Sequence, residues 1–87
     1  MSVVDTGSRF ELEEQGQTAF ATYRRAGELF TIPHVEAPPA LRGRGTAGRL
    51  MDGITALARA QGFKIAPTCP YAIAWFRRHP EAKDVLA

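Results

Sequence analysis

The segment with the clearest chemical potential is a glycine-rich loop at residues 42–48, which reads Arg-Gly-Arg-Gly-Thr-Ala-Gly. Small residues let backbone N–H groups approach a phosphate, and the start of a following helix adds roughly half a positive charge. Arg42 and Arg44 place full charges beside those donors. The loop could also be a turn that only caps the helix. As an anion site it would use these residues: Arg42, Gly43, Arg44, Gly45, Thr46, Ala47 and Gly48.

The three glycines, Gly43-x-Gly45-x-x-Gly48, formally match the G-x-G-x-x-G fingerprint of a dinucleotide site. That fingerprint needs an acidic residue roughly 20 residues later to hold a ribose, and residues 63–68 contain none. A chain of 87 residues is also too short for the two halves of a dinucleotide-binding fold. A P-loop is excluded because no Gly-Lys-Ser/Thr sequence follows. The loop therefore indicates a phosphate site of another kind.

Three further side chains, His34, Glu36 and Cys69, could take part in chemistry. Cys69 lies in the cationic half of the chain, where a thiolate would be favoured, or it is simply a small buried apolar residue. Glu36 could accept a proton if partial burial raises its pKa, or it could pair with Arg42 or Arg44 in solvent. His34 could serve Cys69 as a base, or it could only hydrogen-bond the backbone.

The first half of the chain predicts an antiparallel meander. Apolar and polar residues alternate within residues 8–14, 18–25 and 29–35, which is the period of a half-buried strand. Turn signals separate these runs at residues 15–17 and 26–28. We therefore expect three consecutive strands that pair with their neighbours.

The second half predicts a βαβ unit. Apolar residues recur at three- and four-residue steps within residues 47–58, and Gly62 is a candidate C-cap. Residues 63–67 predict a short strand and residues 71–78 a second helix. The strands at 29–35 and 63–67 should therefore run parallel, joined by a right-handed crossover.

This topology brings the candidate side chains to one rim, because ligands of such units bind beyond the carboxyl ends of the strands. His34 and Glu36 end one parallel strand, and Cys69 follows the other. Pro33 lacks a backbone donor, so we expect a bulge or a splayed end there. If the strand stays regular, His34 and Glu36 share one face and Val35 points to the other.

Composition predicts one globular domain over residues 1–87, with 45% apolar and 23% charged residues. No signal peptide opens the sequence, and no apolar run approaches the roughly 20 residues that cross a bilayer. Cys69 is the only cysteine, so an intrachain disulfide is excluded. We expect a cytoplasmic protein without a membrane partner.

The net charge of +2 conceals a split. Residues 1–40 carry three Arg/Lys and six Asp/Glu, whereas residues 41–87 carry eight and three. An anionic ligand should therefore bind the second half. The pI of about 9.1 would also suit a nucleic-acid binder. A nucleic-acid partner is not favoured, because no recognition motif is present and the arginines gather by the loop rather than along a face.

Arg42-x-x-Gly45-x-Ala47 resembles the R/Q-x-x-G-x-G/A pyrophosphate loop of the GNAT superfamily, the acyl-CoA-dependent N-acetyltransferases. The resemblance extends from about Phe10 to Glu81. Over this span the chain is similar to the short, single-domain YjdJ-type subfamily. Three segments carry this finer resemblance: His34–Gly45, Pro67–Tyr71 and Arg77–Glu81.

The sequence departs from the subfamily at three positions. Val35 stands where such proteins often have Thr, Thr46 where an aliphatic residue is common, and Ala47 where Gly is frequent. Backbone recognition of pyrophosphate tolerates all three, although the bulk of Thr46 could affect loop packing.

The resemblance implies an α/β (α+β) fold, a truncated acetyltransferase in which a meander leads into a βαβ unit with a splayed parallel pair and a C-terminal helix. The truncated fold that the resemblance implies lacks the N-terminal helices that normally shape the acceptor pocket. It also implies acetyl-CoA as the acyl donor, no metal, and an amine acceptor that could be a small molecule, a peptide or a protein. A non-catalytic module that binds CoA or acyl-CoA is the alternative, and a monomer or a weak dimer is expected.

In the superfamily the thioester lies between the splayed strands, so backbone N–H groups near His34 and Val35 would bind the acyl carbonyl. Cys69 would then be a covalent nucleophile or a pocket wall, and Glu36 would take the amine proton. Tyr71 could protonate the leaving thiolate. Arg77 and Arg78 could clamp phosphates or form a solvated helix end. Outside the loop, the expected cofactor contacts are His34, Val35, Cys69, Tyr71, Arg77 and Arg78.

Overall fold

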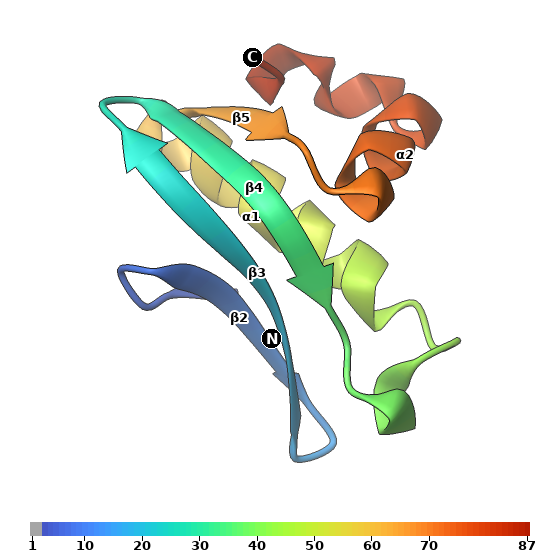
Figure 1. Ribbon diagram of the computed structural model, residues 1–87. Coiled ribbons are helices and arrows are strands. Elements are labelled where there is room, and N and C mark those ends of the chain that lie inside the picture. The colour runs from blue at the N-terminus through green and yellow to red at the C-terminus, as the bar shows by residue number, and fades with distance from the viewer. Residues whose placement is uncertain (1–2) are drawn as a thin grey trace.

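Five strands form one mixed sheet in the order β1-β2-β3-β4-β5 (Figure 1). The computed structural model describes residues 3–87. The predicted meander is confirmed, because β2 pairs antiparallel with β3 and β3 with β4. The sequence pattern does not predict the short strand β1. The strands are β1 (Val4–Asp5), β2 (Arg9–Glu14), β3 (Gln17–Ala26), β4 (Leu29–Glu36) and β5 (Lys64–Pro67).

Strand β4 contains a bulge at Pro33, as its missing backbone donor predicted. Thr22 pairs with His34 and Arg24 with Thr31, so one residue of β3 stands opposite two residues of β4. A bulge leaves one residue outside the ladder and bends the strand. Pro33 therefore costs the sheet little, since the ladder is already interrupted there.

Strands β4 and β5 are parallel, and their pairing stops early. The register runs from Leu29 opposite Lys64 to Ile32 opposite Pro67. The N–H groups of Thr68 and Cys69 then both donate to the Ile32 carbonyl, at 3.1 and 3.2 Å. Beyond that point the edge of β4 that faced β5 has no strand partner among residues 3–87. The splayed parallel pair is therefore confirmed.

Both α-helices pack on the same side of the sheet, α1 across its back and α2 beside β4 where β5 has ended (Figure 1). Helix α1 begins after Gly45 and ends at Gln61, and the N–H of the following Gly62 donates to the Ala58 carbonyl as a C-cap. No helix within residues 3–87 is long and apolar enough to cross a membrane. The helices are η1 (Pro39–Leu41), α1 (Thr46–Gln61), α2 (Pro70–Arg78) and η2 (Pro80–Val85), the first and last being 3₁₀ turns.

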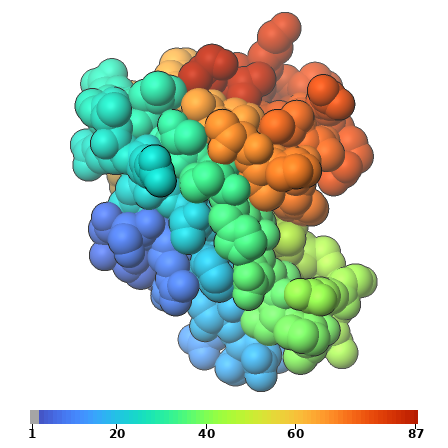
Figure 2. All heavy atoms as spheres, in the orientation of Figure 1, coloured from blue at the N-terminus to red at the C-terminus, as the bar shows by residue number. Residues whose placement is uncertain are grey.

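The core lies between the sheet and the two helices. Phe10, Phe30 and Phe63 stack within it, with 3.9 Å between the ring centroids of Phe30 and Phe63. Trp75 and Phe76 of α2 are buried in the same cluster. The opposite face of the sheet has no helix over it in the described chain, and β2, β3 and β4 lie open on the near side of Figure 2.

Candidate functional site

The backbone of the glycine-rich loop is fixed by hydrogen bonds that leave several donors free. The N–H groups of Arg42 and Arg44 donate to carbonyls of η1 at 3.3 Å each, and Arg49 donates to Gly45 at 3.0 Å. The first N–H groups of a helix have no intrahelical acceptor. Within residues 3–87, no acceptor is present for these five N–H groups: Gly43, Gly45, Thr46, Ala47 and Gly48.

Two glycines give the loop its shape. Gly43 has φ +77° and Gly45 has φ +76°, both in the left-handed region that side chains disfavour. Gly45 is the residue that precedes α1, so its conformation turns the chain into the helix. The loop thus presents free donors at the positive end of α1, as a phosphate cradle requires.

The start of α1 is held by a carboxylate from the β2–β3 hairpin. Glu14 accepts a hydrogen bond from the buried Thr46 hydroxyl at 2.6 Å and two from Arg49, at 2.6 Å from Nε and 2.8 Å from Nη2. The same Arg49 Nη2 donates to the Arg44 carbonyl at 2.9 Å. These donors, Arg49 first and Thr46 second, lower the pKa of Glu14 from 4.5 to about 2.

The role of Glu14 cannot be predicted from its local sequence. Its partners lie 32 and 35 residues away, and no local pattern links a strand end to a distant helix start. The one available signal was Thr46, a polar residue where the subfamily often has an aliphatic one. Its buried hydroxyl is satisfied by the hydrogen bond that it donates to Glu14.

Arg42 and Arg44 flank the loop at the surface. Arg42 Nε donates to the Ala37 carbonyl and Arg44 Nη1 to the Gln15 side chain, each at 3.2 Å. Neither forms an ion pair with a carboxylate in the part of the chain that the structure describes. Each guanidinium has five N–H donors, so both keep charge and donors available for an anion.

A cleft of about 270 Å³ opens over the loop. It runs from Ala37, just after β4, across the start of α1 to Tyr71 in α2. A Cβ atom placed on Gly48 would lie 3.8 Å from the Tyr71 hydroxyl, so that hydroxyl faces the helix start. Burial raises the pKa of Tyr71, and the positive charge of Arg78 opposes this effect. The neutral phenol is therefore the form present near neutral pH.

The structure brings His34 and Glu36 together. His34 Nε2 lies 2.9 Å from Glu36 Oε1, and both side chains are about half exposed on the open face of the sheet. Val35 points the other way and packs against the core, opposite Ala21. His34 and Glu36 therefore lie on the same face of the sheet, as the strand pattern predicts.

The structure does not join His34 to Cys69 by a hydrogen bond within the described chain. Cys69 is only 7% exposed and belongs to the core cluster. Its N–H is held by the Ile32 carbonyl, and its carbonyl accepts from Ile73. Cys69 thus lies beside β4 at the point of splay, as a mostly buried wall.

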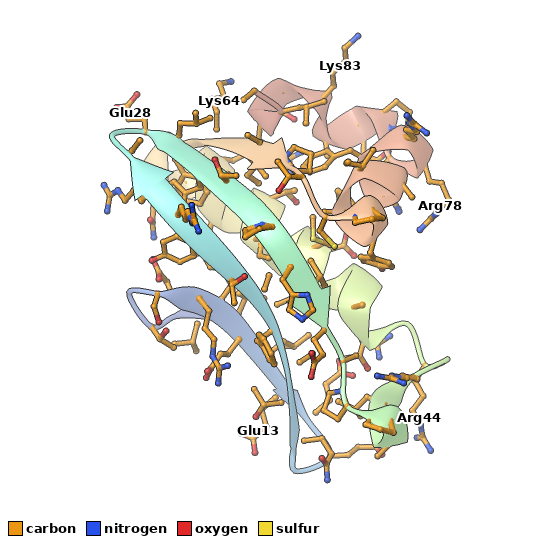
Figure 3. The ribbon with its side chains drawn as sticks, in the orientation of Figure 1. Glu13, Glu28, Arg44, Lys64, Arg78 and Lys83 are labelled. Atoms are coloured by element: carbon orange, nitrogen blue, oxygen red, sulfur yellow. The ribbon has the colours of Figure 1, made fainter. Side chains whose placement is uncertain are left out.

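Arg77 and Arg78 are exposed in the last turn of α2. Arg77 lines a separate apolar groove of about 330 Å³ with Pro67 and Phe76. Arg78 is near enough to Tyr71 to influence its pKa, yet it lies well apart from Arg44 in Figure 3. Neither arginine lines the cleft over the loop.

From residue 9 to residue 85, the chain matches the family model described as GCN5-related N-acetyl-transferase. The chain belongs to this family. The GNAT resemblance is therefore confirmed, whereas the YjdJ-type subfamily stays a prediction. No curated protein matches the chain.

A solved structure supports the GNAT fold. An NMR structure of a GCN5-like protein from Staphylococcus aureus, described as a candidate N-acetyltransferase, matches with a TM-score of 0.76 at 21% identity. The match covers 99% of this chain and 87% of that one. The predicted α/β arrangement, with an antiparallel meander and a parallel β4–β5 pair, is thus confirmed for this GNAT domain.

Proposed function

We propose that this GNAT domain is an acetyl-CoA-dependent N-acetyltransferase, and that its loop binds the pyrophosphate of the donor. The observation that carries the proposal is the set of free N–H groups at the start of α1, flanked by Arg42 and Arg44. Such a set favours a multiply charged anion. Membership of this family supports the pyrophosphate of CoA as that anion.

The remainder of the donor would run from the loop along the cleft toward the splay. The cleft passes Tyr71 and Ala37. In the part of the chain that the structure describes, the edge of β4 beyond Ile32 lacks a strand partner. Alternate residues of a strand direct their backbone groups to the same edge. An N–H on this open edge could donate to the thioester oxygen and stabilise the oxyanion that forms there.

The chemistry needs a neutral amine and a place for its proton. In the proposed reaction, Glu36 accepts the amine proton through a water, and His34 fixes the carboxylate by its 2.9 Å hydrogen bond. The amine nitrogen forms a bond to the thioester carbon, and the carbon–sulfur bond breaks. The electron pair of that bond goes to the sulfur, and the resulting thiolate takes a proton from Tyr71 or from water.

Direct attack by the amine is favoured here over a covalent acetyl-cysteine route. Cys69 is mostly buried, and within residues 3–87 the hydrogen bond of the His34 ring goes to Glu36 and not to Cys69. In this scheme Cys69 lines the path of the donor. An acetyl group on Cys69 is the competing route.

The test is an assay of CoA release with acetyl-CoA and a panel of amines, peptides and proteins, run beside direct measurement of CoA binding. Binding together with acceptor-dependent release of CoA is expected. Binding without release for any acceptor would favour the non-catalytic CoA module, and no binding would contradict the assignment of the loop.

A further inference from the structure

The open face of the sheet next to the splay carries a patterned surface. On β2 the apolar Phe10 and Leu12 point to the core, so the residues between them point outward. On β3 the buried Ala19 and Ala21 likewise leave Phe20 on the outer face. We call this surface the sheet-face patch, formed by Arg9, Glu11, Glu13, Phe20, His34 and Glu36.

Strand register sets these side chains in rows. Glu11 pairs with Phe20, and Phe20 pairs with Glu36, so an aromatic ring lies between two carboxylates across three strands. In the next row, Thr22 of β3 is paired with Arg9 of β2 on one side and with His34 of β4 on the other. Neighbouring strands are about 4.8 Å apart, so the row from Glu11 to Glu36 spans about 10 Å, roughly the length of three extended residues.

The sheet-face patch is acidic, in contrast to the loop. Three carboxylates, Glu11, Glu13 and Glu36, share it with one guanidinium, Arg9. That guanidinium lies over the Phe20 ring, 4.3 Å from its centroid, and donates to Glu11 at 2.6 Å. The Arg9 guanidinium thus already covers one side of the Phe20 ring and pairs with the Glu11 carboxylate. Glu36, on the other side of the ring, is half exposed, and among the described residues its side chain bonds only His34.

The direction from which the acceptor arrives follows from the proposed function, on which this inference rests. The His34–Glu36 pair lies on the open face, so an amine that gives its proton there must approach across the sheet-face patch. A lysine amine has a pKa of about 10.4 and arrives as a cation, which the carboxylates attract. It loses that extra proton to solvent before the neutral amine attacks. The donor phosphates would bind at the cationic loop, whereas the acceptor amine would bind at the acidic sheet-face patch. Each substrate would thus bind a surface of opposite charge.

We propose that the sheet-face patch docks a basic, lysine-bearing protein segment in extended form across β2, β3 and β4. A small amine would touch only Glu36. A peptide several residues long reaches Phe20, Glu11 and Glu13 as well. The acceptor is thereby assigned as a basic polypeptide rather than a free small amine.

The test is fluorescence anisotropy with two labelled nine-residue peptides, one alternating Lys and Ser and one alternating Glu and Ser. The Lys peptide should bind and the Glu peptide should not. Glu13→Lys should weaken binding of the Lys peptide about three- to tenfold, because a like charge then faces it. Glu28→Lys is the matched control, since Glu28 is exposed at the far end of the sheet from Glu13 (Figure 3). The affinity of this variant for the Lys peptide should stay within about twofold of wild type.

CoA binding, measured in the same samples, separates this inference from the proposed function. CoA that binds normally beside a Lys peptide that does not bind would overturn the docking surface and leave the function standing. Equal weakening by Glu13→Lys and Glu28→Lys would also overturn it, since net charge alone would then explain the binding. A protein that binds the peptide but no CoA would contradict the proposed function.

Discussion

The carboxylate of Glu14, at the end of β2, accepts a 2.6 Å hydrogen bond from the hydroxyl of Thr46, the first residue of α1. Thr46 is 1% exposed, so this bond is made inside the protein. It ties the β2–β3 hairpin to the loop whose N–H groups form the proposed phosphate site. The shape of the loop therefore depends on a residue far from it in sequence.

Thr46→Val should test this anchor. Valine keeps the shape of threonine and removes the donor, so the free energy of unfolding should fall by about 1 kcal/mol. Urea unfolding would measure the change. Thr18→Val is the control, because Thr18 is an exposed strand residue and should show no loss. Equal effects in the two variants would mean that the Thr46 hydroxyl contributes nothing particular.

The pH dependence of stability should carry the signature of Glu14. Its pKa is lowered from 4.5 to about 2 in the folded chain. The unfolded state therefore binds the proton more tightly, and the stabilisation is complete above about pH 4.5 and lost as pH falls toward 2. Wild type and Glu14→Gln should thus differ in unfolding free energy at pH 6 and converge near pH 2. A difference that stays constant down to pH 2 would contradict the role of the carboxylate.

Glu36→Gln should lower kcat by about a hundredfold, since a general base contributes on this scale. The dissociation constant of CoA should not change, because Glu36 lies outside the cleft over the loop. Steady-state kinetics and CoA titration would measure both. Glu28→Gln, an exposed carboxylate in the β3–β4 turn, should leave kcat unaltered. A normal kcat for Glu36→Gln would remove Glu36 from the mechanism.

Cys69→Ala should retain most of the turnover, because direct attack by the amine needs no thiol. Intact-mass analysis of wild type after incubation with acetyl-CoA should show no added acetyl group at Cys69. An acetyl adduct that appears in wild type and is absent from Cys69→Ala would establish the covalent route instead.

Local patterns were enough to predict most of the fold. Alternation of apolar residues predicts strands, and Pro33 predicts the bulge because a missing donor has only local consequences. A period of two likewise puts His34 and Glu36 on one face without any tertiary information. The spacing of Gly43, Gly45 and Gly48 is also a local signal, and it predicts the loop.

The parts that sequence reasoning missed depend on tertiary packing. The Glu14–Thr46 bond joins a hairpin to a helix start, and nothing in either segment specifies its partner. The burial of Cys69 depends on how the chain leaves β5 and enters α2, where its N–H turns back to Ile32. Arg77 faces a separate groove because the C-terminal η2 packs against α2, and this element was not predicted.

The central claim is that the loop binds CoA through its backbone. Thermal unfolding of wild type, Gly45→Glu and Gly27→Glu with and without about 1 mM CoA, the upper range of ordinary substrate affinities, tests it most directly. Gly27 is the matched control because it also has a positive φ, +61°, and lies in the β3–β4 turn. Wild type and Gly27→Glu should be stabilised by CoA, and Gly45→Glu should show no shift. No shift in wild type, or an equal shift in Gly45→Glu, would contradict the claim.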